Sequence, residues 1–213
     1  YPDAHLRLYT SGMGLDEAFC AKAAECGLNE IRFSVKLDEG EGAVEEALAA
    51  IALARRFPFD AMVEMPVVPA ELERMKLLLR QLDDLGVRGI NLLELCYPHR
   101  NWGDFARRGL ALKNPPFEVL YDYGYAGGMA VAGSEEACLE LVLFALDEGL
   151  SLGVHCCTLD NKNRDQVLQR NRAVALDPEV YELGDDCFYR TAKAFDGDKE
   201  KVSAYLDGIG ARY

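Results

Sequence analysis

The sequence predicts an α/β fold, and within that class a partial TIM-like (β/α) barrel that lacks its first strands. Apolar runs typical of strands stand at Leu6–Tyr9, Glu30–Lys36, Asp60–Val68, Val87–Leu95 and Leu150–Cys157. Amphipathic helical stretches fill most of the gaps, and this alternation indicates a parallel sheet with crossover helices. Because the chain begins almost inside a strand, we expect it to be cut from a longer protein.

Helices are predicted between these strands where apolar residues recur at helical spacing. A turn at 10–12 precedes the first helix, and Gly27 ends it. Ser134 and the two glutamates after it open a helix that runs through Glu148. The apolar stripes of the first three helices are Leu15, Phe19, Ala23 and Cys26; Val44, Leu48, Ile51 and Ala52; and Leu72, Met75, Leu79 and Leu82.

We divide the chain into a barrel part over 1–157, with an inserted segment over 97–133, and a helical C-terminal extension over 158–213. In the extension, helices are expected over 162–176, 178–193 and 198–207. The inserted segment is rich in glycine and aromatic residues. Long insertions in compact domains are usually functional, and active-site loops grow after barrel strands. We therefore expect its aromatic stretch over 97–128 to cover the substrate.

Composition limits the classes of partner. The chain has 213 residues, half of them hydrophobic, and 36 acidic against 23 basic residues, which gives a net charge of −13. An acidic chain repels nucleic acid and anionic membrane surfaces. No apolar run approaches the ~20 residues of a membrane span. We expect neither nucleic acid nor a membrane as partner.

The seven cysteines are odd in number and irregular in spacing. Most lie in predicted helices or strands, as small buried hydrophobic residues do, rather than in a disulfide framework. A reduced, cytoplasmic setting is therefore expected. No pair has the CxxC spacing of a zinc site.

Polar residues near the strand ends are the candidates for chemistry, because barrel active sites form there. In the second strand Arg32, Ser34 and Lys36 share one face, whereas a buried parallel strand is normally apolar on both. This pattern indicates an interior that holds a ligand, and a partly solvated strand is the alternative. Ser11 follows the first strand in the same way.

Glu64 and Glu94 each lie in a buried strand, near its end. A buried carboxylate is costly unless it meets a cation, a hydrogen-bond donor or a ligand. The two residues are therefore candidates for a site. The alternative is a structural ion pair with Arg32 or Lys36.

His155, Cys156 and Cys157 carry groups that bind transition metals. Adjacent strand residues point to opposite faces, so only His155 and Cys157 could share a site. They are weak metal candidates, and a strand that holds small residues is the favoured alternative. We expect no complete metal site in this chain.

Several segments together resemble the radical S-adenosylmethionine (SAM) enzymes. Residues 9–17 look like the turn after the third strand of that family, and Glu25–Val35 is similar to its passage into the fourth strand. Val63–Pro69 resembles the fifth strand and Leu85–Leu95 the sixth. Gly153–Asn171 is similar to uncharacterised radical SAM proteins related to pyruvate formate-lyase activating enzyme.

The resemblance implies a parent enzyme that binds SAM and a 4Fe-4S cluster and generates a 5′-deoxyadenosyl radical. It also implies an electron donor such as flavodoxin or ferredoxin, and it leaves the substrate unknown. The family's CxxxCxxC cluster motif is absent from this sequence. We therefore expect the isolated fragment to hold no cluster, to carry no bound cofactor when it is purified and to be inactive alone.

The resemblance also assigns cofactor contacts. Ser34 and Lys36 match the position that meets the ribose or carboxylate of SAM, and the backbone around Leu95 matches the one that meets adenine. Glu64 maps near the fifth-strand contacts. The expected cofactor-binding set is Ser11, Ser34, Lys36, Glu64, Glu94 and Leu95.

Two other classes of function stay open. One is a metal-dependent (β/α)-barrel lyase or hydrolase that uses Glu64, Glu94 and His155. The other is a non-catalytic binding module. If the barrel is cut, the first strand has an unpaired edge, and such an edge recruits another strand. We therefore expect that edge to be covered, by self-association through Leu6–Tyr9 or by the C-terminal helices folding across it.

Overall fold

The computed structural model describes residues 4–98, 100, 102–114, 128–185 and 188–210. The chain divides into two compact units. One spans 1–117 and 127–158, and the other spans 118–126 and 159–213. Each unit is described by itself.

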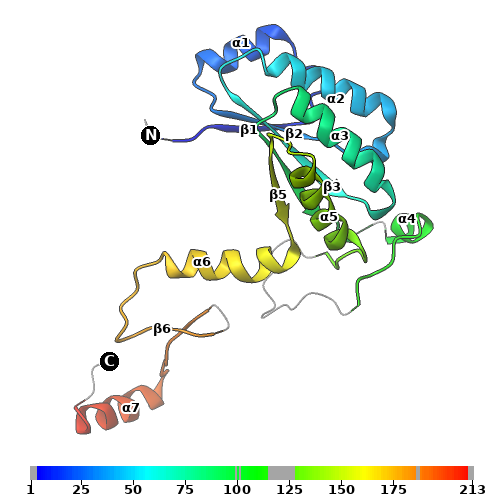
Figure 1. Cartoon of the computed structure of the whole chain (residues 1–213). Coiled ribbons are helices and arrows are strands. Elements are labelled where there is room, and N and C mark those ends of the chain that lie inside the picture. Colours follow the sequence, from blue (N-terminus) through cyan, green and yellow to red (C-terminus); the bar gives the residue numbers. More distant parts are fainter. Residues whose placement is uncertain (1–3, 99, 101, 115–127, 186–187, 211–213) are drawn as a thin grey trace. The chain divides into compact units, whose positions relative to one another are not determined.

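The first unit is built on a five-stranded parallel sheet (Figure 1). Its strands are β1 (Arg7–Thr10), β2 (Glu30–Ser34), β3 (Asp60–Val67), β4 (Gly89–Glu94) and β5 (Gly153–Cys157). They lie in chain order, and every neighbouring pair is parallel. The α/β class and the parallel strands predicted from the sequence are confirmed.

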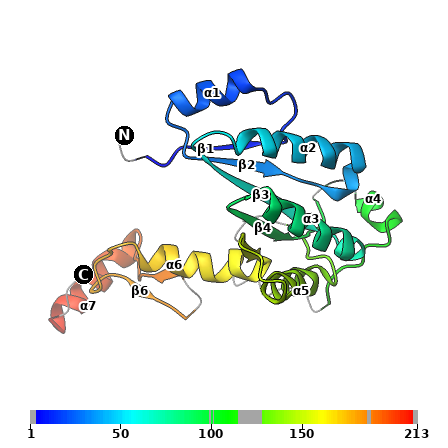
Figure 2. The same ribbon diagram turned by 45° about the horizontal axis from the view of Figure 1, so that its top comes forward.

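Four helices cover one face of the sheet (Figures 1 and 2). They are α1 (Glu17–Glu25), α2 (Glu41–Ala54), α3 (Leu72–Asp84) and α5 (Ser134–Asp147). Three short helices follow the ends of β2, β3 and β4, namely η1 (Leu37–Glu39), η2 (Pro69–Glu71) and α4 (Trp102–Arg107). The helix predicted to begin at Ser134 is confirmed.

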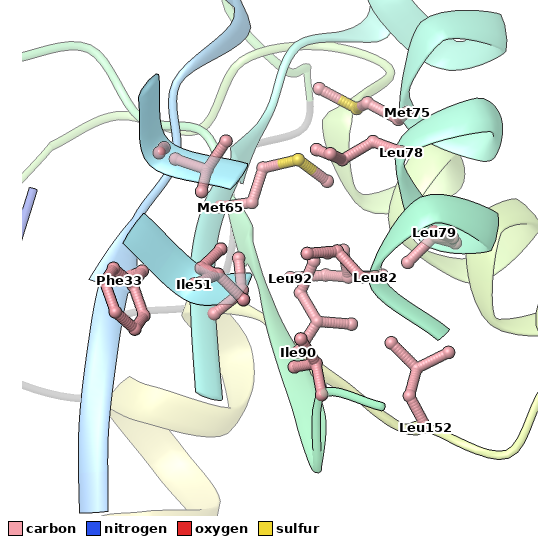
Figure 3. Close-up of a cluster of buried hydrophobic side chains, with 14 of the residues drawn as sticks. Phe33, Ile51, Met65, Met75, Leu78, Leu79, Leu82, Ile90, Leu92 and Leu152 are labelled. Atoms are coloured by element: carbon pink, nitrogen blue, oxygen red, sulfur yellow. The ribbon is translucent and has the colours of Figure 1, made fainter. Parts of the chain in front are cut away.

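The hydrophobic core lies between the sheet and these helices (Figure 3). Every second residue of the strands points into it, as the alternating burial along β3 shows. Phe33, Met65 and Leu92 come from the strands and are fully buried. They pack against side chains from α2 and α3, among them Ile51, Met75, Leu78, Leu79 and Leu82.

The other residues of the strands form what we call the open face of the sheet, which none of these four helices covers. It carries Tyr9, Arg32, Ser34, Met62, Glu64, Asn91, Leu93 and His155, all of them half-buried or exposed. The polar pattern that the sequence showed in the second strand therefore extends across the whole sheet.

The two outer strands of the sheet are β1 and β5, and β1 pairs only with β2 among the strands that the structure describes. Leu6 and Tyr9 remain exposed beside this edge. The covering of the edge, by a second copy or by the C-terminal helices, stays a prediction.

The described part of the inserted segment packs around Tyr97. This buried ring lies 5.2 Å from the Trp102 ring and 5.0 Å from the Phe105 ring, and its hydroxyl donates to the Leu110 carbonyl. Leu112 forms an antiparallel bridge with Val131. Residues 115–127 of the segment lie outside the described residues, so its expected role as a substrate cover stays a prediction.

The second unit contains η3 (Asn161–Asp165), a π-helical turn that runs directly into α6 (Gln166–Arg172), and α7 (Gly197–Gly208) near its end. Between α6 and α7, β6 (Glu182–Leu183) and β7 (Tyr189–Arg190) form an antiparallel hairpin. The helix predicted over 178–193 is therefore wrong, and the extension is not wholly helical.

Local hydrogen bonds explain the hairpin. The Glu179 N–H donates to Asp177 Oδ1 at 2.9 Å, an Asx turn that competes with helix formation. The Gly184 N–H donates to the Phe188 carbonyl at 2.9 Å and joins the two strands. The rings of Tyr181 and Tyr189 meet edge to face at 6.4 Å. No described helix combines the length and the apolar character needed to cross a membrane.

Candidate functional site

A row of four polar side chains crosses the open face from β2 to β5. Ser34 pairs in register with Glu64, Glu64 with Asn91, and Asn91 with His155. Neighbouring strands lie about 4.8 Å apart, so each side chain is within reach of the next. The sequence analysis proposed Ser34, Glu64 and His155 but missed Asn91. Its signal is the alternation of β4, in which Asn91 lies out of phase with the buried Ile90 and Leu92.

Glu64 is held from both sides. The Arg32 guanidinium donates to Glu64 Oε1, and Asn91 Nδ2 donates to Oε2 at 2.9 Å. The side chains of Arg32 and Glu64 are only 15% and 14% exposed. The structure thus contains the ion pair with Arg32 that was the structural alternative for Glu64. The ion pair holds the carboxylate of Glu64 in place, and the side chain still lies on the open face.

Arg32 also binds Glu30, the first residue of β2, which lies two positions earlier on the same strand. Arg7 Nε lies 2.5 Å from Glu30 Oε1, and the guanidinium of Arg32 stacks 5.8 Å from the ring centre of Tyr9. Burial raises the pKa of Glu30, but hydrogen bonds and charge from Arg32 and Arg7 outweigh it, so the pKa is lowered. Burial lowers the pKa of Arg32, but the hydrogen bonds that it donates to Glu30 and Glu64 outweigh burial, so its pKa is raised and the guanidinium stays charged.

The lowered pKa of Glu30 predicts a dependence of stability on pH. Its contribution is fully present above the unfolded-state pKa of about 4.3 and is lost as the pH falls through the lower pKa of the folded state. At about pH 6, Glu30→Gln is expected to be less stable than wild type by about 1–3 kcal/mol. Urea denaturation from about pH 6 down to pH 2 measures this difference, which should shrink with acid. The exposed Glu25→Gln is the control, and a difference that does not change with pH contradicts the account.

A small pocket lies where β1 and β2 end. It has a volume of about 80 Å³, and Ser11, Ser34, Lys36 and Glu46 line it. Gly12 closes the turn beside it with φ of +87°, and a Cβ there would lie 2.9 Å from the Cβ of Ala50. A side chain at position 12 would therefore strain the turn that presents Ser11. The structure brings three of the expected cofactor-binding residues together.

Glu94 is not part of this arrangement. It lies in phase with Ile90 and Leu92, so it points to the helix-covered face, and its side chain is 1% exposed. Lys113 Nζ lies 3.7 Å from Glu94 Oε1 and also binds Glu135 of α5. Glu64 and Glu94 therefore lie on opposite faces of the sheet.

The backbone of Leu95 is engaged within the protein. Its N–H donates to the hydroxyl of Ser134 at 2.7 Å, and its carbonyl accepts from the Val131 N–H at 2.9 Å. The expected adenine contact at Leu95 therefore cannot use the N–H without breaking the bond to Ser134.

The cysteines near the end of β5 are divided between the two faces. Cys156 packs against the helix side, where it meets Cys138 of α5, and Cys157 has the opposite phase and is buried. The hydrogen bond with Cys156 and then burial raise the pKa of the Cys138 thiol. The six cysteines in the described ranges are free thiols, and Cys187 lies outside them. Within those ranges no three His, Cys, Asp or Glu side chains are grouped to hold a metal.

A larger groove of about 540 Å³ lies in the second unit. Val180, Val202 and Leu206 line it together with Lys193 and Lys199. None of the expected site residues borders it. The open face of the sheet is the stronger candidate site, because Ser34, Glu64, Asn91 and His155 stand in register on it, and Ser34 also lines the pocket at the ends of β1 and β2.

Comparison with models of known protein families found no match, and comparison with curated proteins found no significant relative.

Proposed function

We propose that this chain is the later part of a radical SAM enzyme, with the open face of its sheet turned toward SAM and substrate. The observation that carries the proposal is the pocket at the ends of β1 and β2. Ser11, Ser34 and Lys36 line it, and all three belong to the cofactor-binding set expected from the sequence. In parallel α/β folds, ligands bind at the carboxyl ends of the strands.

The donor set of the pocket fits one end of SAM. Lys36 offers an ammonium group, and Ser11 and Ser34 offer hydroxyl groups, which together suit a carboxylate. Glu46 lines the same pocket and complements an amino group. A volume of about 80 Å³ is far below the ~300 Å³ of a typical small-molecule pocket, so only part of a ligand fits. The rest of SAM would lie over the open face.

The cluster does not fit this chain. None of the seven cysteines has the spacing of the cluster motif, and the described residues contain no group of metal ligands. We propose that a longer protein supplies the 4Fe-4S ligands, the missing strands beside β1 and the docking site for a flavodoxin or ferredoxin, in the cytoplasm. With SAM and cluster bound, such an enzyme supplies a 5′-deoxyadenosyl radical. The residues described here orient SAM and substrate.

The competing metal-dependent lyase or hydrolase has less support. Its three residues, Glu64, Glu94 and His155, do not converge, because Glu94 lies on the helix side of the sheet. A non-catalytic binding module remains the other candidate, and a SAM titration separates it from the proposal.

Lys36→Ala is expected to weaken SAM binding by about 10-fold or more, because a charge-assisted hydrogen bond contributes about 1.5–3 kcal/mol. Ser34→Ala is expected to weaken it about 3-fold to 10-fold through the loss of a neutral hydrogen bond. Isothermal titration of SAM into the chain measures both effects, and thermal unfolding should show little change because both side chains are exposed.

Lys22→Ala is the matched control, since Lys22 is an exposed lysine that forms an ion pair with Glu25 and does not line the pocket. Its SAM affinity should equal that of wild type. If wild type binds SAM no better than Lys36→Ala does, the assignment of this pocket is wrong.

A further inference from the structure

We infer that Asn91 fixes the tautomer of His155, so that the imidazole presents a hydrogen-bond acceptor to a hydroxyl or amine group of a ligand on the open face. The inference shares only this face with the proposed function. It rests on the geometry of Glu64, Asn91 and His155, which stand in register on three neighbouring strands.

The orientation of the Asn91 amide is settled by its neighbour. Nδ2 donates to Glu64 Oε2 at 2.9 Å. A carboxylate that forms an ion pair only accepts hydrogen bonds, and Glu64 forms such a pair with Arg32. The amide therefore cannot flip without losing this bond, and Oδ1 must serve as an acceptor elsewhere.

In the structure the acceptor Asn91 Oδ1 is buried and makes no hydrogen bond. A buried polar atom without a partner destabilises the fold, so a hydrogen bond from a nearby donor is favoured. The oxygen has almost no exposed surface, so a neighbouring side chain is the natural donor.

His155 is the neighbour in the right place. It pairs in register with Asn91, and it points to the open face because Val154 and Cys156 on either side pack against the core. In the part of the chain that the structure describes, the imidazole makes no hydrogen bond or ion pair. Residues in register on neighbouring strands lie about 4.8 Å apart, so a rotation of the exposed ring can direct one of its N–H groups toward Asn91 Oδ1.

The consequence for His155 is chemical. A neutral imidazole has one N–H and one bare nitrogen, and the hydrogen bond made by the first decides which nitrogen is bare. The bare nitrogen then faces the open side of the sheet as a fixed acceptor. Arg32, Glu64 and Asn91 thus act as positioning residues for His155, across β2 to β5.

The ligand group that fits this acceptor is a hydrogen-bond donor. The charges nearest to it are already matched, because Arg32 and Arg7 neutralise Glu30 and Glu64. A neutral hydroxyl or a protonated amine can donate to the bare nitrogen, whereas a carboxylate or phosphate cannot. The inference therefore assigns the substrate at least one such donor group.

The test is the tautomer ratio of His155, read from the ring nitrogen shifts in a long-range ¹H–¹⁵N correlation spectrum of the whole chain. The spectrum is recorded at mildly alkaline pH. His155→Gln identifies the signal among the three histidines. We expect a ratio of about 10 to 1 in wild type, the value that a hydrogen bond of about 1.4 kcal/mol gives.

In Asn91→Leu the ratio of the two His155 tautomers should fall about 10-fold. In Glu64→Gln it should also fall, because a glutamine amide no longer fixes the orientation of Asn91. Ser34→Ala is the control, since Ser34 stands in the same row but on the far side of Glu64, and its ratio should match that of wild type. The backbone amide spectrum checks that each variant folds.

Equal ratios in wild type and Asn91→Leu overturn the inference, as does the absence of any preference in wild type. Neither outcome bears on SAM. If wild type shows the expected tautomer ratio but does not bind SAM, the proposed function is contradicted and this inference is not.

Discussion

Replacing Arg32 with methionine is expected to lower the free energy of unfolding by about 3 kcal/mol. The substitution keeps a side chain of similar length but leaves Glu30 and Glu64 without their shared cation. Removing one partner of a buried ion pair costs about 3–5 kcal/mol. Because the site is 15% exposed at Arg32, some water reaches the carboxylates and the lower end applies. Urea denaturation near neutral pH, followed by circular dichroism, measures the change.

Arg56→Met is the matched control. Arg56 binds Glu17 at 3.0 Å, but both side chains are more than 60% exposed, and such surface pairs contribute at most about 1 kcal/mol. The triple variant with Glu30→Gln and Glu64→Gln removes the unpaired charges and should recover part of the loss. If Arg32→Met destabilises no more than Arg56→Met does, the network on the open face is not structural.

Replacing Ser134 with alanine is expected to lower the free energy of unfolding by about 2–3 kcal/mol. The hydroxyl accepts from the Leu95 N–H and donates to the Val67 carbonyl, each at 2.7 Å, and the residue is fully buried. It therefore ties the start of α5 to the ends of β3 and β4. Its loss leaves two buried backbone groups without partners, at about 1–3 kcal/mol each, less what relaxation recovers.

Two measurements check this prediction. Urea denaturation gives the change in stability, and hydrogen exchange at the Leu95 amide should speed up more than at amides inside β3. Ser151→Ala is the control, because Ser151 is exposed and only its backbone N–H is bonded, to Asp83. An unchanged exchange rate at Leu95 would show that this hydrogen bond does not form in solution.

The strands could be predicted from the sequence because each is an apolar run between turn residues. All five were located, with differences of at most three residues at their ends. The ends differ because an apolar run continues past the last ladder hydrogen bond. Val87 and Lys36 belong to the apolar or alternating pattern, yet they lie outside β4 and β2.

The hairpin of the second unit could not be predicted in the same way. Its strands have two residues each, too short to show a period of two, and the apolar residues around Val180 and Leu183 also fit helical spacing. The turn at Asp177 and the bond at Gly184 decide the outcome, and both depend on side-chain and backbone geometry rather than on hydrophobicity.

The candidate site was only partly predictable, because the pairing register between neighbouring strands was unknown. Glu64 and Glu94 look equivalent in the sequence, each a single carboxylate near the end of a buried strand. Their faces differ because Glu64 pairs with Asn91, and Glu94 is three positions further on, an odd number. One sequence does not give the register between two strands, so Asn91 was missed and Glu94 was included.

Because successive residues of each strand point to opposite faces, selection for core packing and selection for ligand contacts act on different residues. In β3, Val63 and Met65 hold the sheet to the helices, while Glu64 between them faces outward to the site. A substitution on the open face, outside the ion-pair network of Arg32, changes what the sheet contacts and leaves the core intact. A change on the other face acts on folding first. New ligand preferences can therefore evolve at open-face positions outside that network, on a scaffold that the core residues keep stable.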